Sequence, residues 1–222
     1  MSETANSEPE GTAMDSQDPL LSLSNLSPRI DVYPYYYHMT LPGAENDCFL
    51  RKGTVEKLIK AANYLPQNLK LVIFDGWRSY ETQLAIYEAI KAHLETRNLT
   101  KEKMQEEISK YVAIPTRDLN KPAPHLTGGA VDLTIADENG WLDMGTDFDD
   151  FTEKAELEWY EKKHQLTRQE EAIRDNRRLL RKVMEGAGFV SNSEEWWHYD
   201  YGNRRWANAT GNSIIYFGIQ KN

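Results

Sequence analysis

The chain has 222 residues and is acidic, with a formal net charge of −9 and a pI near 5.1. Nucleic-acid binding requires a clustered positive field, so we expect no nucleic-acid partner. Hydrophobic residues make up 40 % of the chain and aromatic residues 11 %, which is enough for a packed core. The length suits one domain with short appendages, and the sequence gives no indication of an oligomeric state.

The N-terminus and the hydropathy pattern bear on location. The first residues lack the positive start and the apolar run of a secretory signal. No stretch approaches the roughly 20 apolar residues of a membrane span. We therefore expect a cytoplasmic protein with no membrane partner.

Cys48 is the only cysteine, which excludes an intrachain disulfide and a thiolate metal cage.

Local patterns divide the chain into a tail and a single domain. Residues 1–28 are rich in Ser, Glu and Asp and predict a flexible N-terminal tail, which leaves 29–222 as one domain. Apolar residues at helical spacing predict helices over 51–64, 79–96, 100–112 and 167–186. Ser79 suits the N-cap of the second helix, and Thr167 with Glu170 forms a capping box at the start of the last. Apolar and β-branched runs predict strands over 71–74, 130–135, 189–190, 195–201 and 213–219.

These elements follow no regular alternation of strand and helix. Parallel sheets arise from such alternation, so we expect an α+β fold instead, with a small, mostly antiparallel sheet flanked by helices. Residues 136–150, with two glycines and five aspartates, predict a loop.

Two segments far apart in the chain carry the candidate metal-binding and catalytic residues. His125-Leu-Thr-Gly-Gly-Ala-Val-Asp132 runs from a loop into a predicted strand, and Glu195-Trp-Trp-His198 follows much later. Catalytic zinc prefers three protein ligands and keeps a fourth position open for water. The two histidines and Asp132 satisfy that preference. With one anionic ligand the site stays net positive, which keeps the metal acidic. The sequence thus predicts a zinc site on the face of the sheet.

The spacing of Glu195 and His198 sets a condition on this site. Residues i and i+3 of a strand point to opposite faces, so both can approach one metal only if the segment is bent or partly loop. The condition is met most simply if Glu195 is not a ligand and lies near the bound water.

Structural roles compete with the functional ones for residues taken singly. His125 alone would be a structural histidine, Trp196 and Trp197 suit a packed core, and Arg78 beside Asp75 could form a structural ion pair. The structural interpretation of His125 weakens once the predicted ligands, Glu195 and the intervening glycines are taken together.

Four blocks of the chain resemble the VanX-type zinc D-alanyl-D-alanine dipeptidases. In the order of that family they are Phe74-Asp-Gly-Trp-Arg78, His125 through Asp132, Met144-Gly-Thr-Asp-Phe-Asp149 and Glu195-Trp-Trp-His-Tyr199, and the resemblance spans about residues 46 to 206. It implies one zinc ion per chain, bound by His125, Asp132 and His198. It also implies that Glu195 is the general base, that Arg78 polarises the scissile carbonyl and that Asp149 holds the substrate's ammonium group.

The activity implied by this resemblance is hydrolysis of D-Ala-D-Ala or a similar small D,D-dipeptide by attack of a zinc-bound water, with a link to cell-wall peptidoglycan. The chain departs from the family pattern at Ala123 and Pro124, where a serine is common, and at Ser79, where a proline is common. Two alternatives keep the same metal set: a D,D-carboxypeptidase or peptidoglycan endopeptidase, and a zinc-bearing binding module without catalysis. Glu195 favours an enzyme, because a structural zinc site does not use a spare carboxylate.

Overall fold

A computed structural model describes the fold of residues 18–97 and 99–221. The main sheet has the strand order β2-β4-β5-β8-β7, and a short strand, β6, pairs with the end of β5. Only the β2–β4 pair is parallel among these strands. The predicted α+β class with a mostly antiparallel sheet is confirmed. The strands are β2 (Ile30–Val32), β4 (Lys70–Asp75), β5 (Ala130–Asp137), β6 (Gly140–Trp141), β7 (Val190–Ser191) and β8 (His198–Asp200).

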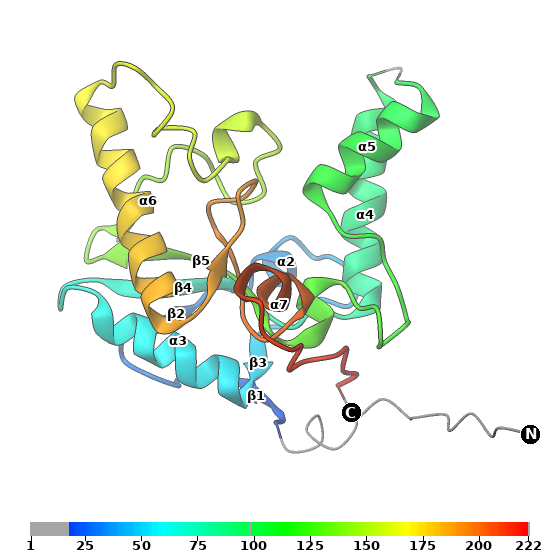
Figure 1. Ribbon diagram of the computed structural model, residues 1–222, viewed down its shortest axis with the longest axis horizontal. Coiled ribbons are helices and arrows are strands. Elements are labelled where there is room, and N and C mark those ends of the chain that lie inside the picture. The colour runs from blue at the N-terminus through cyan, green and yellow to red at the C-terminus, as the bar shows by residue number, and fades with distance from the viewer. Residues whose placement is uncertain (1–17, 98, 222) are drawn as a thin grey trace, which may run out of the picture.

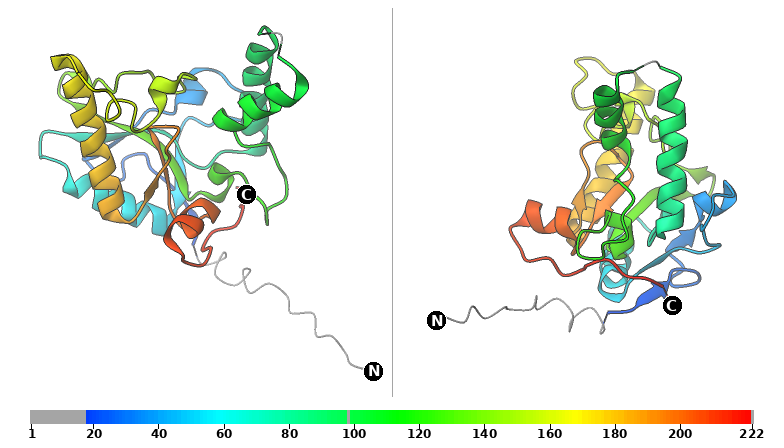
Figure 2. Two further views of the ribbon diagram at one scale, coloured as in Figure 1. Left: turned by 45° about the horizontal axis from the view of Figure 1, so that its top comes forward. Right: turned by 90° about the vertical axis from the view of Figure 1, so that its right-hand side faces the viewer.

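Helices flank the sheet as two pairs (Figure 1). On one side α3 packs against α6, and on the other α4 and α5 lie next to each other as a projecting hairpin (Figure 2). Shorter helices and turns carry several side chains of the cleft, among them Tyr36, His125 and Arg205. The helices are α2 (Tyr35–His38), α3 (Lys52–Tyr64), α4 (Tyr80–Glu95), α5 (Lys101–Tyr111), η1 (Pro124–Thr127), η2 (Glu153–Ala155), α6 (Arg168–Ala187) and α7 (Arg204–Thr210).

The four long helices agree with the sequence predictions because their signals are local. Ser79 Oγ accepts a hydrogen bond from the backbone N–H of Thr82, as an N-cap does. Thr167 and Glu170 form the predicted capping box of α6. That helix ends at Gly188, whose φ of 107° is a left-handed conformation that favours glycine. Caps and helical periodicity thus set these boundaries.

The predicted tail is wrong for its last eleven residues, 18–28. Strand β1 (Leu20–Ser22) pairs antiparallel with β3 (Phe49–Arg51) in a separate two-stranded sheet. Leu23 is fully buried, and its backbone N–H donates to the carbonyl of Cys48. Leucines spaced among the polar residues of this segment reach the core, which outweighs its polar composition. Residues 1–17 lie outside the described residues.

The predicted C-terminal strands are partly wrong. Residues 213–219 form no strand; their backbone instead bonds to loops, with the N–H groups of Ile215 and Tyr216 donating to the carbonyl of Gly202. The strand predicted over 195–201 is shorter, because β8 begins only at His198. The apolar residues of 213–219 cover loops rather than a sheet edge.

No helix within residues 18–97 and 99–221 is long and apolar enough to cross a membrane. The cytoplasmic location, and the absence of a nucleic-acid partner, stay predictions of the sequence.

Candidate metal centre and substrate cleft

Two paired strands and the turn that precedes one of them bring the metal-binding residues together. Asp132 on β5 lies directly opposite His198 on β8 and opposite Asp75 on β4. A register shift between Ile73 and Asp75 interrupts the β4–β5 ladder at this level. His125 comes from η1, the single turn that precedes β5. Sheet register therefore places Asp132 beside His198, and the η1 turn adds His125.

The ligand atoms of these residues lie at distances that suit one small cation. His125 Nε2 is 3.2 Å from His198 Nδ1 and 3.3 Å from Asp132 Oδ2, and His198 Nδ1 is 2.9 Å from Asp132 Oδ1. Tetrahedral zinc with bonds of roughly 2.0–2.2 Å separates its ligand atoms by about 3.4 Å. All three side chains are buried. The donor set and its spacing fit zinc.

The second nitrogen of each histidine is already occupied, which leaves the first free for a metal. His125 Nδ1 lies 2.7 Å from the carbonyl oxygen of Gly76, and His198 Nε2 lies 3.1 Å from Asp200 Oδ2. A carbonyl or carboxylate in this place fixes the tautomer and the ring orientation of a metal-binding histidine. Asp200 is not among the residues predicted from the sequence, although it stands two residues after His198 and so on the same face of the strand.

The charges around the three predicted ligands also favour a cation. Burial acts to raise the pKa of Asp132, but the two ligand histidines outweigh it and hold that pKa well below its usual range. Burial acts to lower the pKa of His198, yet Asp200 and Asp132 raise it to about 10. Two buried carboxylates thus demand positive charge at this point, which a proton or a metal ion can supply.

Glu195 stands beside the metal ligands without belonging to them. It lies in the turn before β8, and its Oε2 is 3.9 Å from His198 Nδ1. Asn192 Nδ2 donates to the same oxygen at 2.8 Å and so orients the carboxylate. Burial raises the pKa of Glu195, although His198 acts to lower it. Because Glu195 lies outside the strand, the condition set by its spacing from His198 is met.

Arg78 is fixed by a dense set of acceptors at the end of β4. Its Nε and Nη2 both contact Asp75 Oδ2, at 2.8 and 2.7 Å, and Nη1 donates to Gln83 Oε1 at 2.9 Å. Nη2 also approaches Tyr36 and Asp132, at 3.4 and 3.5 Å. Burial opposes its charge, but Asp75, Tyr36, Asp132 and Asp149 together outweigh burial and raise the pKa of Arg78, so the guanidinium is cationic. The ion pair with Asp75 that competed with a catalytic role is present, and it aims Arg78 at the cleft.

Asp149 faces the same cleft from a loop. Its φ of 61° is left-handed, a conformation that aspartate tolerates better than most residues. Tyr36, from α2, donates its hydroxyl proton to Asp149 Oδ2 at 2.8 Å. Burial raises the pKa of Asp149 to about 7, although Arg78 and Tyr36 act to lower it.

Arg177 holds the loop that carries Asp149. Its guanidinium donates to three backbone carbonyls, those of Met144, Lys154 and Glu156, at 2.7, 2.8 and 2.7 Å. The side chain of Arg177 is buried, although it belongs to the exposed-looking run of basic residues in α6. Burial lowers the pKa of Arg177 to about 10, which still leaves it cationic at neutral pH.

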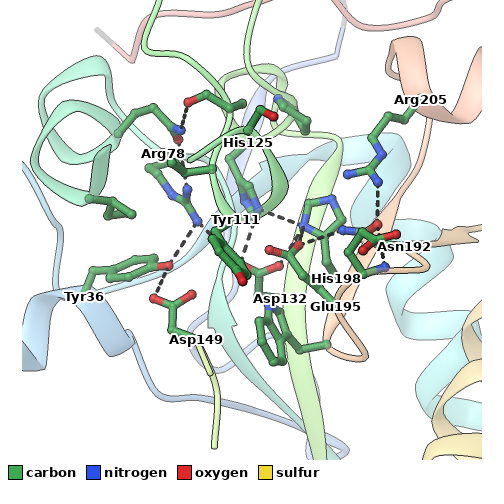
Figure 3. Close-up of a pocket in the computed structure, with 18 residues that line it drawn as sticks. Tyr36, Arg78, Tyr111, His125, Asp132, Asp149, Asn192, Glu195, His198 and Arg205 are labelled. Carbon is green, nitrogen blue, oxygen red and sulfur yellow. Dashed lines mark hydrogen bonds and ion pairs between the residues drawn. The ribbon is translucent and has the colours of Figure 1, made fainter. Parts of the chain in front are cut away.

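The six predicted site residues line one open cleft of about 490 Å³. Figure 3 shows Tyr36 and Asp149 at one end, the three predicted ligands in the middle, and Asn192 and Arg205 at the other end. Tyr36, Asn192 and Arg205 are not predicted from the sequence, because they come from elements that meet only through tertiary packing.

Residues 40–214 match the peptidase family described as D-ala-D-ala dipeptidase. The chain belongs to this family. It is 30 % identical over 175 residues to a D-alanyl-D-alanine dipeptidase of Synechocystis sp., covering 71 % of each chain. It is 31 % identical over 155 residues to a D-alanyl-D-alanine dipeptidase of Escherichia coli, covering 69 % of this chain and 66 % of the relative.

Among solved structures, a vancomycin resistance D,D-pentapeptidase, VanY, in complex with Zn(II) has a TM-score of 0.44 and 17 % identity, over 78 % of this chain and 86 % of that chain. The family match confirms the predicted class of enzyme, a peptidase that uses zinc, and the donor set described above fits that metal.

Proposed function

We propose that this protein is a zinc dipeptidase that hydrolyses D-Ala-D-Ala, a dipeptide tied to cell-wall peptidoglycan. The observation that carries the proposal is the presence of Asp149, Arg78 and Glu195 around the metal-binding triad in a single cleft. The family membership and the names of the relatives support the choice of substrate.

The zinc ion would be held by His125, Asp132 and His198. When bound there, zinc lowers the pKa of a water molecule and polarises the carbonyl group that is attacked. Asp200 and the carbonyl of Gly76 keep the two histidines in the orientation that this binding needs.

Glu195 would move the proton in this reaction. Its carboxylate accepts the proton that the attacking water loses, and it then delivers that proton to the nitrogen of the departing alanine as the C–N bond breaks. A partly buried carboxylate with a raised pKa suits both steps, because it must take up a proton and release it again. Asn192 donates to Oε2 of Glu195, which lies 3.9 Å from His198 Nδ1, and so holds the carboxylate beside the metal-binding residues.

Arg78 would bind the carbonyl oxygen as negative charge develops on it. The Nη2 contacts with Tyr36 and Asp132, at 3.4 and 3.5 Å, are longer than ordinary hydrogen bonds and can give way to a stronger acceptor. Its short ion pair with Asp75 meanwhile holds the guanidinium in place, so little reorganisation is needed during the reaction.

Asp149, with Tyr36, would bind the free ammonium group of the substrate. This contact sets the length of the substrate, since a residue added at the amino end replaces the ammonium group at this position with a neutral amide. The same contact separates a dipeptidase from a D,D-carboxypeptidase or endopeptidase, which must accept a longer chain there.

The test is release of D-alanine by the protein loaded with one zinc ion per chain. We expect turnover of D-Ala-D-Ala, and at least roughly tenfold lower kcat/KM for N-acetyl-D-Ala-D-Ala, which lacks the ammonium charge. Absence of release at full zinc occupancy would refute the proposal. Efficient removal of D-alanine from a pentapeptide ending in D-Ala-D-Ala would instead favour the carboxypeptidase activity.

A further inference from the structure

The cleft has a second cation whose role the proposed reaction does not use. Arg205, from α7, lines the cleft on the side of the metal-binding triad away from Asp149 (Figure 3). Its side chain is 46 % exposed, unlike that of Arg78, which is 8 % exposed. A half-exposed cation at the rim of a cleft is accessible to an incoming anion.

The contacts of Arg205 fix its position but leave part of its guanidinium free. Nη2 donates to Asn192 Oδ1 at 2.5 Å, and Nε lies 3.5 Å from Asp200 Oδ2. Asp200 is shared with His198 and Asn203, so it neutralises Arg205 only in part. Nη1 has no hydrogen bond or ion pair to any residue that the structure describes.

Arg78, the other arginine of the cleft, is committed elsewhere. Two of its nitrogens contact Asp75 within 2.8 Å and a third donates to Gln83. It is therefore anchored for the scissile carbonyl and has little capacity left for a second anionic group.

We propose that Arg205 binds the C-terminal carboxylate of the substrate. The inference rests on the proposed function, in which Asp149 holds the ammonium group and the triad faces the scissile carbonyl. A dipeptide bound in that direction extends its carboxylate past the triad, toward Arg205. The planar fork of a guanidinium can bind a carboxylate through two parallel hydrogen bonds. The substrate is then a free dipeptide recognised by opposite charges at its two ends.

This placement also connects the carboxylate to the general base. Arg205 contacts Asn192, and Asn192 in turn donates to Glu195. Binding of the carboxylate by Nη1 and by the second proton of Nη2 leaves this chain of contacts intact, so recognition of the substrate's end and orientation of Glu195 use different protons of one side chain.

The experiment measures binding in a protein that cannot turn over. Zinc-loaded Glu195→Gln is titrated by calorimetry with D-Ala-D-Ala and with D-alanyl-D-alaninamide, whose C-terminus carries no charge. Adding Arg205→Gln should weaken binding of the dipeptide roughly 10- to 100-fold and that of the amide less than about twofold. Arg204→Gln is the matched control, since the neighbouring Arg204 donates to the carbonyl of Asn120. It should leave both affinities unchanged.

Four outcomes separate this inference from the proposed function. Equal weakening of dipeptide and amide by Arg205→Gln would overturn the inference, because Arg205 would then act only through Asn192. No preference for dipeptide over amide in an otherwise active enzyme would overturn it too. A preference that depends on Arg205, without any turnover by the unmodified enzyme, would support the inference and refute the dipeptidase. Binding of neither ligand at full zinc occupancy would overturn both.

Arg205→Lys tests whether weaker binding by the Arg205→Gln variant reflects a folding defect. A lysine keeps the charge but lacks the fork of donors, so it should recover part of the preference for dipeptide over amide. Recovery supports carboxylate binding. A lysine variant that binds the dipeptide no better than the glutamine variant, with an unchanged amide affinity, contradicts it.

Discussion

The two halves of the cleft are built in different ways. In the metal-binding half, Asp132 and His198 are opposed residues of paired strands, and a carbonyl or carboxylate holds each ligand histidine. In the half that faces the substrate's amino group, Asp149 sits on a loop with left-handed backbone and Tyr36 on a single turn of helix. Strand register fixes the metal geometry, while loop conformation fixes the recognition of the substrate.

Because of this difference, mutations in the two halves of the cleft should have different effects. A side chain in the sheet is surrounded by buried partners, so its replacement disturbs the metal and the catalytic groups together. A loop can be exchanged or reshaped without moving the strands. Mutations in the metal-binding half should therefore affect chemistry or zinc affinity, and mutations in the loop half should affect KM.

The largest effect is expected from Glu195→Gln, which keeps shape and removes the base. On the scale of general acid–base catalysis, kcat should fall roughly 10²–10⁴-fold. Zinc content should stay at one per chain, since Glu195 is not a ligand. The measurement is steady-state kinetics with zinc analysis, and Glu194→Gln, at the neighbouring exposed position, is the control. A variant that turns over normally would exclude Glu195 as the base.

A smaller effect is expected from Asp200→Asn, which tests the support behind the metal. The hydrogen bond to His198 Nε2 loses its charge, and zinc affinity should fall roughly 10- to 100-fold. Competition with a chelator measures the affinity, and activity should return when zinc is in excess. Asp137→Asn, at the far end of β5, serves as control. Unchanged zinc affinity would show that the sheet alone orients His198.

The sequence could predict the metal-binding half more fully than the loop half. His125, Asp132, Glu195 and His198 have residue types and spacings that suit catalytic zinc, and the long helices have local caps and periodicity. The resemblance supplied the role of Asp149, which charge and spacing alone do not distinguish from the other aspartates of its loop.

Contacts that depend on tertiary packing could not be predicted in this way. Asn192 and Arg205 meet at Glu195 only because α7 folds back against the end of β7. Residues 213–219 are apolar enough for a strand, but the same side chains serve equally well to cover loops. Leu23 was assigned to a tail because composition averages over a segment and misses single buried positions.

In the loop half, Asp149→Asn should raise KM for D-Ala-D-Ala by roughly tenfold with little change in kcat. Asparagine tolerates the left-handed backbone and still offers an oxygen to the ammonium group, so only the charge is lost. Asp147→Asn, two residues earlier and exposed, should leave KM unchanged. A fall in kcat with constant KM would place Asp149 in the chemistry rather than in binding.

The smallest effect concerns stability and also involves Asp149. Its pKa is raised from 3.8 to about 7 in the folded protein, so between these pH values the folded chain keeps a proton that the unfolded chain has released. The unfolding free energy contributed by this group therefore falls as pH rises from about 4 to 7 and stays low above pH 7. Asp149→Asn removes this loss. Because Asp149 is only partly buried, we expect the variant to gain about 1–2 kcal/mol relative to wild type between pH 5 and pH 8.

Urea denaturation of both proteins at the two pH values, without zinc, measures this difference. Asp147→Asn again serves as the control and should show no comparable gain. Added zinc should shrink the gain, because a cation near Asp149 favours its ionised form in the folded protein. If Asp149→Asn is no more stable than wild type at pH 8, the loop holds the Asp149 carboxylate in contact with water. The recognition half would then be more hydrated than the buried metal-binding half, which strengthens the contrast between them.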